Sequence, residues 1–439
     1  MLGISLWRGV LGLEDTAIED VRLDPDGLLV IDVRPMARQR RRCGRCLRRC
    51  AGYDEGSGRR RWRTLDQGTT MAFLEADAPR VRCGVHGVVV AHVPWAGHGA
   101  GHTHTFDQQV AWLVVHTSKS AVVELMRIAW RTVGAIITRY WASTAAQRAD
   151  KYGTDGLEGL SRIGIDEISY KRGHLFLTVV VDHDTGRLVW AAPGRDRATL
   201  RGFFDQLGPA RSARITHVSA DQANWIEHVV TERCPHAVQC ADPFHIIKWA
   251  TEALDEVRRD TWRAARAAGA THHNGRHHGG VQRRDSTGIA RKLRNSRYAL
   301  WKNPDRLTVR QQEKLAWIAK TDPRLHRAYL LKEGLRYVFA VKGEPGRIAL
   351  TRWLSWARRC RIPAFVHLAK RITAVRHRIE ATLEHGLSNA LIESVNTKIR
   401  LLTRLAFGYH SPQPLIALAM LSLGGHRPQL PGRSPRISQ

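Results

Sequence analysis

The chain has 439 residues, of which 43% are hydrophobic and 25% are charged, a composition that excludes an intrinsically disordered protein and is sufficient for several folded domains. The formal net charge of +29 favours nucleic acid as the partner over an anionic membrane or a merely solvated basic surface. The longest apolar stretches, 110–115 and 415–423, are too short for a bilayer, and Glu14 and Asp15 interrupt the apolar N-terminal stretch. We therefore expect no membrane partner, no signal peptide and a cytoplasmic, nucleoid-associated location.

Residues 1–100 are expected to form a zinc-binding module that also binds DNA. Residues 1–33 suggest short strands, and Leu28–Val33 follows a turn signature. Cys43 and Cys46 form a CxxC pair, and Cys83 and His86 form a CxxH pair. A two-residue spacer lets both ligands of a turn reach one ion, and four protein ligands leave no open position. This spacing predicts one structural Zn²⁺.

Other interpretations of the cysteines stay open. The chain has seven cysteines, an odd number that argues against a disulfide framework, and they could be incidental buried thiols. Cys50 could replace one ligand, and a histidine of the 98–104 stretch (His98, His102, His104) could supply the fourth. An arginine-rich run surrounds the first pair, and we expect it to contact phosphates rather than only solvent: Arg40, Arg41, Arg42 and Arg45.

Residues 101–155 are predicted to be helical and to contain a helix-turn-helix. Ser118 or Ser120 can cap a first helix, whose apolar stripe is Val122, Leu125, Met126 and Ala129. A break near 128–131 leads to a second stripe formed by Val133, Ile136 and Ile137. The polar side of the second helix suits a major groove and carries the predicted DNA-binding residues Arg131, Thr132 and Arg139. The alternative is an ordinary helical hairpin.

Residues 156–246 are predicted to form the first part of a catalytic core. Three strands joined by short loops are expected near 163–166, at Leu175–Asp182 and at Leu188–Ala192. A helix, a strand ending before Asp221, a second helix and a fifth strand ending before Asp242 follow. This order is that of a ribonuclease H-like fold with a mixed five-stranded sheet. The first and fourth strands are neighbours in that fold, so Asp166 and Asp221 should face one site.

Residues 247–385 are expected to form a large all-α insertion into this core. Its tryptophans alternate with Arg and Lys, so they could stack on unpaired bases or simply pack between helices: Trp249, Trp262, Trp301, Trp317, Trp353 and Trp356. The histidines at 272–278 (His272, His273, His277, His278) suggest an exposed loop. Residues 386–426 complete the core, and the Pro-, Gly-, Ser- and Arg-rich stretch 427–439 is expected to be a disordered tail.

A third acid is expected on an amphipathic helix spanning about 389–405. Leu391, Val395, Ile399 and Leu402 recur at helical spacing on its apolar face. The other face carries Glu393, with Asn396 and Arg400 beside it. Carboxylates that converge on one site repel one another unless a cation holds them. Mg²⁺ prefers oxygen ligands, and two such ions suit in-line displacement at a phosphate. Alone, each acid could equally be a turn or surface residue.

These motifs together resemble the DDE transposases of the bacterial ISL3 insertion-sequence family. The matching segments are GIDEIS with Asp166, SADQANW with Asp221, ADPFHIIKW with Asp242 and His245, and SNALIESVNTKIRLLTRLAFGYHS with Glu393. The resemblance covers about 35–425. It implies that Asp166, Asp221 and Glu393 hold two Mg²⁺ or Mn²⁺ ions, that Asp242 and His245 support the site, and that a helical insertion precedes Glu393. His86 departs from the pattern, since a Cys would complete the second pair.

The expected function is that of an insertion-sequence transposase. Such an enzyme binds double-stranded DNA at terminal inverted repeats, cleaves it, and joins the freed ends to target DNA. The resemblance also implies a homodimer or larger assembly on DNA. Two alternatives remain: a DNA-binding regulator derived from a transposase without catalysis, and a ribonuclease H-like nuclease that resolves DNA junctions.

Overall fold

The structure is a computed structural model that describes residues 2–221, 223–271 and 288–433. The histidines predicted to form a loop at 272–278 lie outside these described residues. The chain divides into two compact units, one formed by Met1–Asp155 with Arg400–Gln439 and the other by Gly156–Ile399. No helix in the described part of the chain is both long and apolar enough to cross a membrane.

The first unit begins with two small sheets. A four-stranded sheet has the order β1-β2-β5-β4, and a three-stranded sheet has the order β3-β6-β7. The strands are β1 (Thr16–Leu23), β2 (Leu29–Pro35), β3 (Ala51–Asp54), β4 (Arg59–Gln67), β5 (Thr70–Asp77), β6 (Arg80–Cys83) and β7 (Gly87–Val90), with a 3-10 turn η1 (Ala37–Gln39) after β2. Strand β2 confirms the strand predicted at Leu28–Val33 to within two residues.

The expectation of strands at the very N-terminus was wrong for its first third. Residues Leu2–Leu11 form helix α1. Trp7 and Leu11 are four positions apart on one helical face, and both pack against the core of the four-stranded sheet. That core is built from alternate residues of β2 and β5 together with Trp62 and Trp95, whose rings meet edge to face at 5.5 Å.

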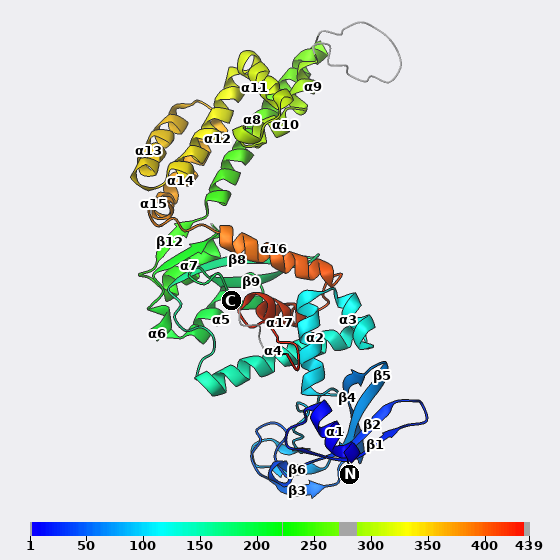
Figure 1. Cartoon of the computed structure of the whole chain (residues 1–439). Coiled ribbons are helices and arrows are strands. Elements are labelled where there is room, and N and C mark those ends of the chain that lie inside the picture. Colours follow the sequence, from blue (N-terminus) through cyan, green and yellow to red (C-terminus); the bar gives the residue numbers. More distant parts are fainter. Residues whose placement is uncertain (1, 222, 272–287, 434–439) are drawn as a thin grey trace. The chain divides into compact units, whose positions relative to one another are not determined.

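Four helices complete the first unit (Figure 1). They are α2 (His104–His116), α3 (Lys119–Met126), α4 (Trp130–Tyr152) and, from the C-terminal stretch, α17 (Pro412–Leu423). Helix α17 packs against α4 and α2, so residues far apart in sequence share one core. Ser118 caps α3 as predicted, since its hydroxyl accepts the backbone N–H of Ala121 at 3.2 Å.

The second unit contains a five-stranded mixed sheet of order β10-β9-β8-β11-β12. Its strands are β8 (Arg162–Lys171), β9 (Leu175–Asp182), β10 (Leu188–Pro193), β11 (His217–Ala220) and β12 (Val238–Ala241). Strands β8, β9 and β10 are antiparallel neighbours, whereas β8, β11 and β12 run parallel. The meander, the helices α5 (Arg197–Leu207) and α7 (Asn224–Arg233) and the strand order follow the prediction; a short α6 (Pro209–Ser212) is additional.

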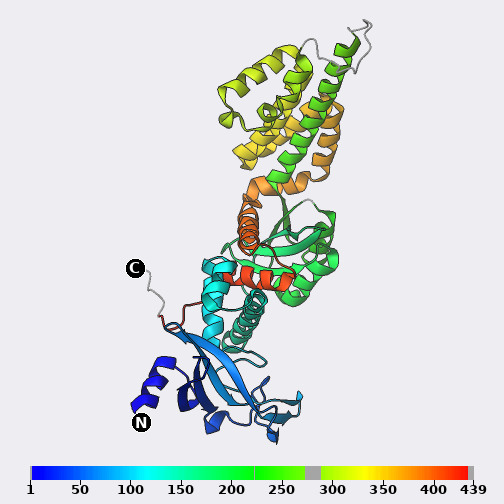
Figure 2. The ribbon, with the colours of Figure 1, turned by 90° about the vertical axis from the view of Figure 1, so that its right-hand side faces the viewer.

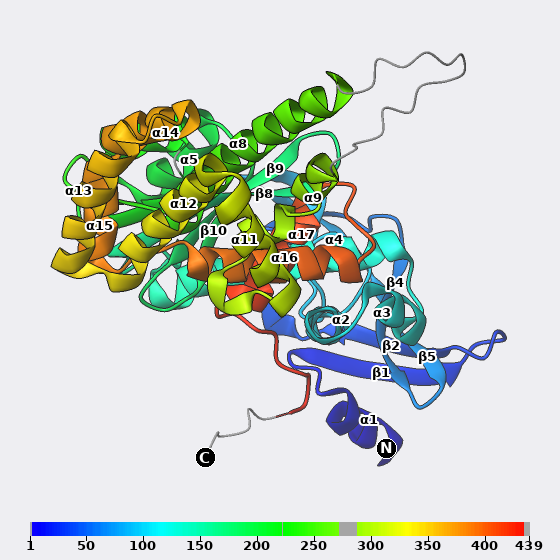
Figure 3. The same cartoon turned by 90° about the horizontal axis from the view of Figure 1, so that it is seen from above.

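A helical region follows the sheet, as expected (Figure 2). It contains α8 (Pro243–Thr271), α9 (Ile289–Arg294), α10 (Arg297–Trp301), η2 (Pro304–Arg306), α11 (Val309–Thr321), α12 (Pro323–Val341), α13 (Gly343–Arg359), α14 (Pro363–Ala374) and α15 (Arg376–His385). Helix α8 packs along α12 and α14 (Figure 3). The chain then continues into α16 (Ala390–Leu405), close to the bounds predicted for the helix that carries Glu393.

Candidate functional site

Three parallel strands position three aspartates next to one another in the sheet. In the register of the sheet, Ile165 of β8 pairs with Ala220 of β11, and Ala220 pairs with Ala241 of β12. The next residue after each of these is an aspartate: Asp166, Asp221 and Asp242. Strands β11 and β12 end just before Asp221 and Asp242, whereas β8 continues to Lys171, so Asp166 lies within β8 directly after its last parallel pair with β11. The three aspartates therefore occupy neighbouring positions across the sheet.

His245 links two of these aspartates. It lies in the first turn of α8, where its Nδ1 is 2.8 Å from Asp242 Oδ2 and its Nε2 is 3.1 Å from Asp221 Oδ2. Asp242 is only 2% exposed and also accepts the backbone N–H groups of Phe244 and His245. The hydrogen bond to Asp242, together with the nearby negative charges, raises the pKa of His245. A histidine placed between two carboxylates fixes the orientation of both.

Helix α16 reaches Asp166 through an asparagine. The amide Nδ2 of Asn396 donates to Asp166 Oδ2 at 2.7 Å, and Asn396 is only 2% exposed. The buried face of the helix consists of Ile392, Val395, Asn396 and Ile399. The prediction placed Leu391 on the apolar face and Asn396 on the polar one; the buried face is in fact turned so that Asn396 faces the sheet. Glu393 lies one turn before Asn396 and is exposed.

The close approach of α16 to β8 depends on a residue that the sequence did not single out. A Cβ built on Gly164 would overlap the side chain of Ile392 and stand 2.9 Å from His183 Nε2. Ile392 is fully buried, so it has little room to move. Gly164 lies two residues before Asp166 on β8, and its missing side chain lets the helix lie against the strand.

Burial makes this site costly to charge. It raises the pKa of Asp166 to about 6, and the negative charge of Asp221 adds to the rise while the backbone N–H of Glu167 opposes it. Burial also raises the pKa of Glu167, although Arg195 pairs with that carboxylate at 3.1 Å. Oxygen ligands whose ionised forms are destabilised in this way fit a divalent cation such as Mg²⁺, which would compensate the charge.

Arg400, expected beside Glu393, is exposed and belongs to the stretch assigned to the first unit.

The tryptophans of the helical region, considered above as base-stacking residues, mostly pack inside that region. Trp353 is 2% exposed and donates to the carbonyl of Leu331 at 2.7 Å. Two arginines make cation–π contacts with tryptophans. The guanidinium carbon of Arg371 is 3.9 Å from the ring centroid of Trp249, and that of Arg297 is 3.8 Å from the ring centroid of Trp301. The alternation of Trp with basic residues therefore supports helix packing here.

The four predicted zinc ligands come together in the first unit. The ligand atoms of Cys43, Cys46, Cys83 and His86 all lie within 4.8 Å of one another. His86 Nδ1 is 3.6 Å from Cys43 Sγ, and Cys46 Sγ is 3.7 Å from Cys83 Sγ. A tetrahedral ion with Zn–S bonds of about 2.3 Å would separate its ligand atoms by roughly 3.8 Å, so the donor set and spacing fit zinc.

Two tight turns present these ligands. Cys43 and Cys46 lie in a loop in which the backbone N–H of Leu47 donates to Cys43 O at 3.0 Å, and Cys83 and His86 lie in the turn between β6 and β7. Hydrogen bonds from backbone N–H groups lower the pKa of Cys83 to about 6, which favours the thiolate that binds metal. Cys50 packs against the cluster without belonging to it, and His98, His102 and His104 do not belong to it either.

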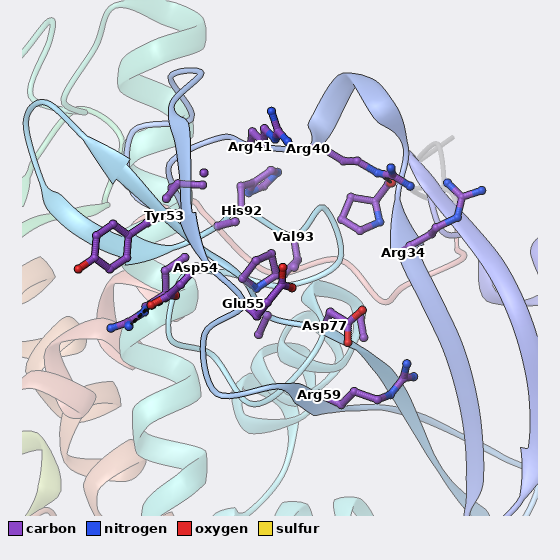
Figure 4. A pocket seen from close by; sticks show the side chains of 18 of the residues that line it. Arg34, Arg40, Arg41, Tyr53, Asp54, Glu55, Arg59, Asp77, His92 and Val93 are labelled. Carbon is purple, nitrogen blue, oxygen red and sulfur yellow. Dashed lines mark hydrogen bonds and ion pairs between the residues drawn. The ribbon is translucent and has the colours of Figure 1, made fainter.

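The arginines around the first turn have three different surroundings. Arg42 braces the turn, because its guanidinium donates to the carbonyls of Arg38 and Leu47, both at 3.0 Å. Arg45 is exposed. Arg40 and Arg41 lie at one rim of a pocket of about 720 Å³ between the two small sheets, with Arg59 across from them (Figure 4). Acidic side chains, Asp54, Glu55 and Asp77 among them, share this lining, so the pocket has mixed charge.

The helix-turn-helix candidate is formed by α2, α3 and α4. Val122 and Met126 of α3 and Val133, Ile136 and Ile137 of α4 are buried, as predicted, but Leu125 is 60% exposed and Ala129 is an exposed N-cap. Arg131 is exposed and Thr132 half-buried in the first turn of α4. The first turn of a recognition helix is the part that meets base edges in a major groove.

Arg139 has a different partner from the one expected. Its Nε and one terminal nitrogen each donate to the carboxylate of Asp107 on α2 at 2.8 Å. Asp107 is 5% exposed, and burial raises its pKa to about 6 although Arg139 opposes the rise. This bidentate ion pair joins α2 to α4 inside the helical core. The guanidinium group of Arg139 therefore contributes to helix packing and is already engaged by a carboxylate.

Comparisons with known proteins find family matches over the regions that contain both clusters. A transposase model of the ISL3 family matches residues 163–419, the helix-turn-helix model of that family matches 91–141, and the zinc-finger model of transposases IS204/IS1001/IS1096/IS1165 matches 39–86. The transposase for insertion sequence element IS1557 of two Mycobacterium tuberculosis strains is 61% identical over 450 residues, covering 100% of both chains. The transposase for IS1001 of Bordetella parapertussis is 27% identical over 420 residues, covering 94% of this chain and 96% of that one.

The family model spans the sheet, the helical region and α16, and the mycobacterial relative matches from end to end. The chain therefore belongs to the ISL3 family of insertion-sequence transposases.

Proposed function

We propose that this transposase cleaves DNA at the terminal inverted repeats of its own insertion sequence and joins the ends to target DNA, using Asp166, Asp221 and Glu393 to hold two divalent ions, Mg²⁺ or Mn²⁺. The observation that carries the assignment is the shared register of β8, β11 and β12, in which Asp166 and Asp221 occupy neighbouring positions across the sheet. When bound, such ions activate the attacking oxygen and stabilise the leaving one.

The roles of the chain's own residues follow from their contacts. Asn396 orients Asp166 and holds α16 against β8, which keeps Glu393 on the helix that faces the sheet edge. His245 orients Asp221 and is itself fixed by the buried Asp242. The strand order, with β8 between an antiparallel pair of strands on one side and a parallel pair on the other, supports a ribonuclease H-like core interrupted by the helices of 247–385.

The first unit supports recognition of the DNA ends. Exposed Arg131 and half-buried Thr132 at the start of α4 suit base edges, and exposed Arg45 near the zinc turns suits phosphates. The zinc ion would be structural, because all four positions of its tetrahedron have protein ligands. Cutting and joining two ends requires both to be held together, so we propose a homodimer or larger assembly on DNA.

A strand-joining assay tests this proposal. The substrate is a duplex that carries one end of the element as it lies in the genome, with a circular plasmid as target and Mg²⁺ or Mn²⁺ supplied. Wild-type protein is expected to nick at the end of the repeat and to produce joined products. Specific end binding without any nicking would indicate a regulator without catalysis. Cleavage of branched junctions in preference to repeat ends would indicate a junction-resolving nuclease.

A further inference from the structure

Phe407 is exposed to a degree that folding does not explain. It follows the C-terminus of α16 and is 83% exposed, more than any other large hydrophobic residue in the described part of the chain. Its neighbours in sequence are buried: Ala406 is 3% exposed and Tyr409 is 7% exposed. The loop is therefore anchored to the first unit on both sides of Phe407, while the phenyl ring itself is left in solvent. Burying such a ring would normally be favourable.

The backbone at Phe407 is also unfavourable for this residue type. Its φ is +46°, in the left-handed region that glycine and asparagine occupy most readily. The N–H of Phe407 donates to Arg404 O at 3.0 Å and that of Gly408 to Thr403 O at 2.9 Å, which ends the helix. Glycine is the usual residue at such a helix end. A strained aromatic residue that stays largely in solvent points to a function outside folding.

The surroundings of Phe407 connect it to the helix-turn-helix. Its ring centroid is 6.3 Å from that of Trp130, the first residue of α4. The ammonium group of Lys119 stands 4.5 Å from the Trp130 ring and 5.6 Å from that of Tyr409. Two exposed arginines are close in sequence: Arg131 directly follows Trp130, and Arg404 precedes Phe407 by three positions. The exposed ring therefore lies beside the N-terminal end of α4, the part of a recognition helix that meets base edges. The exposed Arg131 and Arg404 suit phosphates.

We infer that Phe407 stacks on a base of the DNA bound by the helix-turn-helix, as an aromatic wedge that opens one base step. Stacking on a base uses the whole ring and requires no hydrogen bond, which suits a phenyl group without polar atoms. The helix-turn-helix match covers residues 91–141, which include Trp130 beside the ring, and so favours DNA as the ligand here. The choice of the element's end as the duplex rests on the proposed function.

The test compares three substitutions at this position. Phe407→Ala removes the ring, Phe407→Gly removes the ring and also suits the left-handed backbone, and Phe407→Trp keeps an aromatic ring. Leu401→Ala is the matched control, because Leu401 is an apolar residue on α16 that is 54% exposed. The probe is a duplex of one element end with 2-aminopurine at successive positions. Its fluorescence rises when the modified base loses its stacking partner.

Wild-type protein and the Leu401→Ala and Phe407→Trp variants should raise the fluorescence at one position of the probe. The Ala and Gly variants of Phe407 should leave it low and bind about tenfold more weakly. The Gly variant should melt at the same temperature as wild type or higher, so its weaker binding would not reflect unfolding.

Two results would overturn the inference. Wild-type affinity and wild-type fluorescence for Phe407→Gly would mean that this residue only ends the helix. A change in sedimentation of the free protein on Phe407→Ala, with DNA affinity unchanged, would mean that a second copy of the chain covers the ring. If wild-type protein bound a scrambled duplex as well as the element end, the proposed repeat recognition would fail. In that case the fluorescence of wild-type protein and of the Phe407 variants would be compared on the scrambled duplex, so the inference about Phe407 would still be tested.

Discussion

The zinc ligands and the proposed catalytic acids of this transposase are held by different kinds of structure. Cys43, Cys46, Cys83 and His86 lie in two tight turns whose small sheets carry a limited core. Asp166 lies within β8 and Asp221 directly after β11, in a sheet with a large core of its own, and α16 brings in Asn396 and Glu393 from far along the chain. The zinc turns should therefore depend on their ion for structure, whereas the acidic site should keep its structure and lose only activity without its ions.

The largest expected effect is on the zinc turns. Cys83→Ser, or removal of zinc with a chelator, should unfold residues 39–54 and 80–90, because binding of a structural zinc contributes on the order of 10 kcal/mol to folding. Strands β4 and β5 should stay protected by the separate core of the four-stranded sheet. Hydrogen exchange of 39–54 and 80–90 measures the loss, and the catalytic sheet should stay protected. Cys50→Ser is the control, since Cys50 lies beside the cluster but outside it. If hydrogen-exchange protection in Cys83→Ser equalled that of the wild-type protein, the zinc turns would not depend on their ion for structure, and the two sites would not differ in this respect.

Substitution of the acids should abolish cleavage and leave the fold intact. Asp166→Asn, Asp221→Asn and Glu393→Gln should each lower the cleavage rate by roughly 10³-fold, because each removes a proposed ligand. Burial raises the pKa of Asp166 to about 6, so its ionised form is destabilising at neutral pH and Asp166→Asn should not lower the melting temperature. Asp184→Asn, which alters an acid paired with Arg162 outside the site, is the control. Full cleavage activity of Glu393→Gln would show that Glu393 is not a ligand of the catalytic ions.

A smaller effect is expected at His245, which contacts Asp221 without being a proposed ligand. His245→Ala should raise the Mg²⁺ concentration needed for half-maximal cleavage about 10- to 100-fold, the range seen when a residue that orients a ligand is lost. Excess Mg²⁺ should restore most of the rate. The exposed His228 on α7 provides a control in His228→Ala. A rate that stays low at any Mg²⁺ concentration would instead give His245 a direct catalytic role.

The smallest effect concerns acid stability of the first unit. Burial, with Arg139 and Arg63 nearby, lowers the pKa of His102 to about 4. The unfolded chain therefore binds a proton between pH 6.5 and pH 4 that the folded unit does not, so stability is complete above pH 6.5 and falls as the pH drops towards 4. The full shift would be worth roughly 3 kcal/mol, and because His102 is only half-buried, solvent screening should reduce the loss to about 2 kcal/mol. Thermal melts across this window should show a shallower decline for His102→Phe, whose ring can stack on Phe106 as His102 does.

Zinc release must be followed in the same melts with a metal indicator, because protonated thiols also release zinc at low pH. Identical pH profiles of the wild-type protein and His102→Phe, with zinc retained, would contradict the assignment to His102.

Features set by local sequence could be predicted, and features set by packing could not. The run LFLTVVVD predicted β9 with its observed bounds, and ligand spacing predicted the zinc cluster. The pairing of Arg139 with Asp107 could not be read from the helix pattern, because it depends on how α2 meets α4. Asn396 was placed on the polar face for the same reason: only the position of β8 makes its burial favourable. The amphipathic spacing of Trp7 and Leu11 could have revealed α1.

Gly164 has a consequence for how copies of such an element decay. Because any side chain at this position would collide with Ile392, a single-nucleotide change that adds one methyl group can push α16 away from β8. All the acids would remain in the sequence, and the protein would still bind DNA through its first unit. A genomic copy that looks intact by its catalytic motif could thus be immobile and could compete with active copies for the same ends. Surveys of active elements should therefore inspect this glycine as well as the acids.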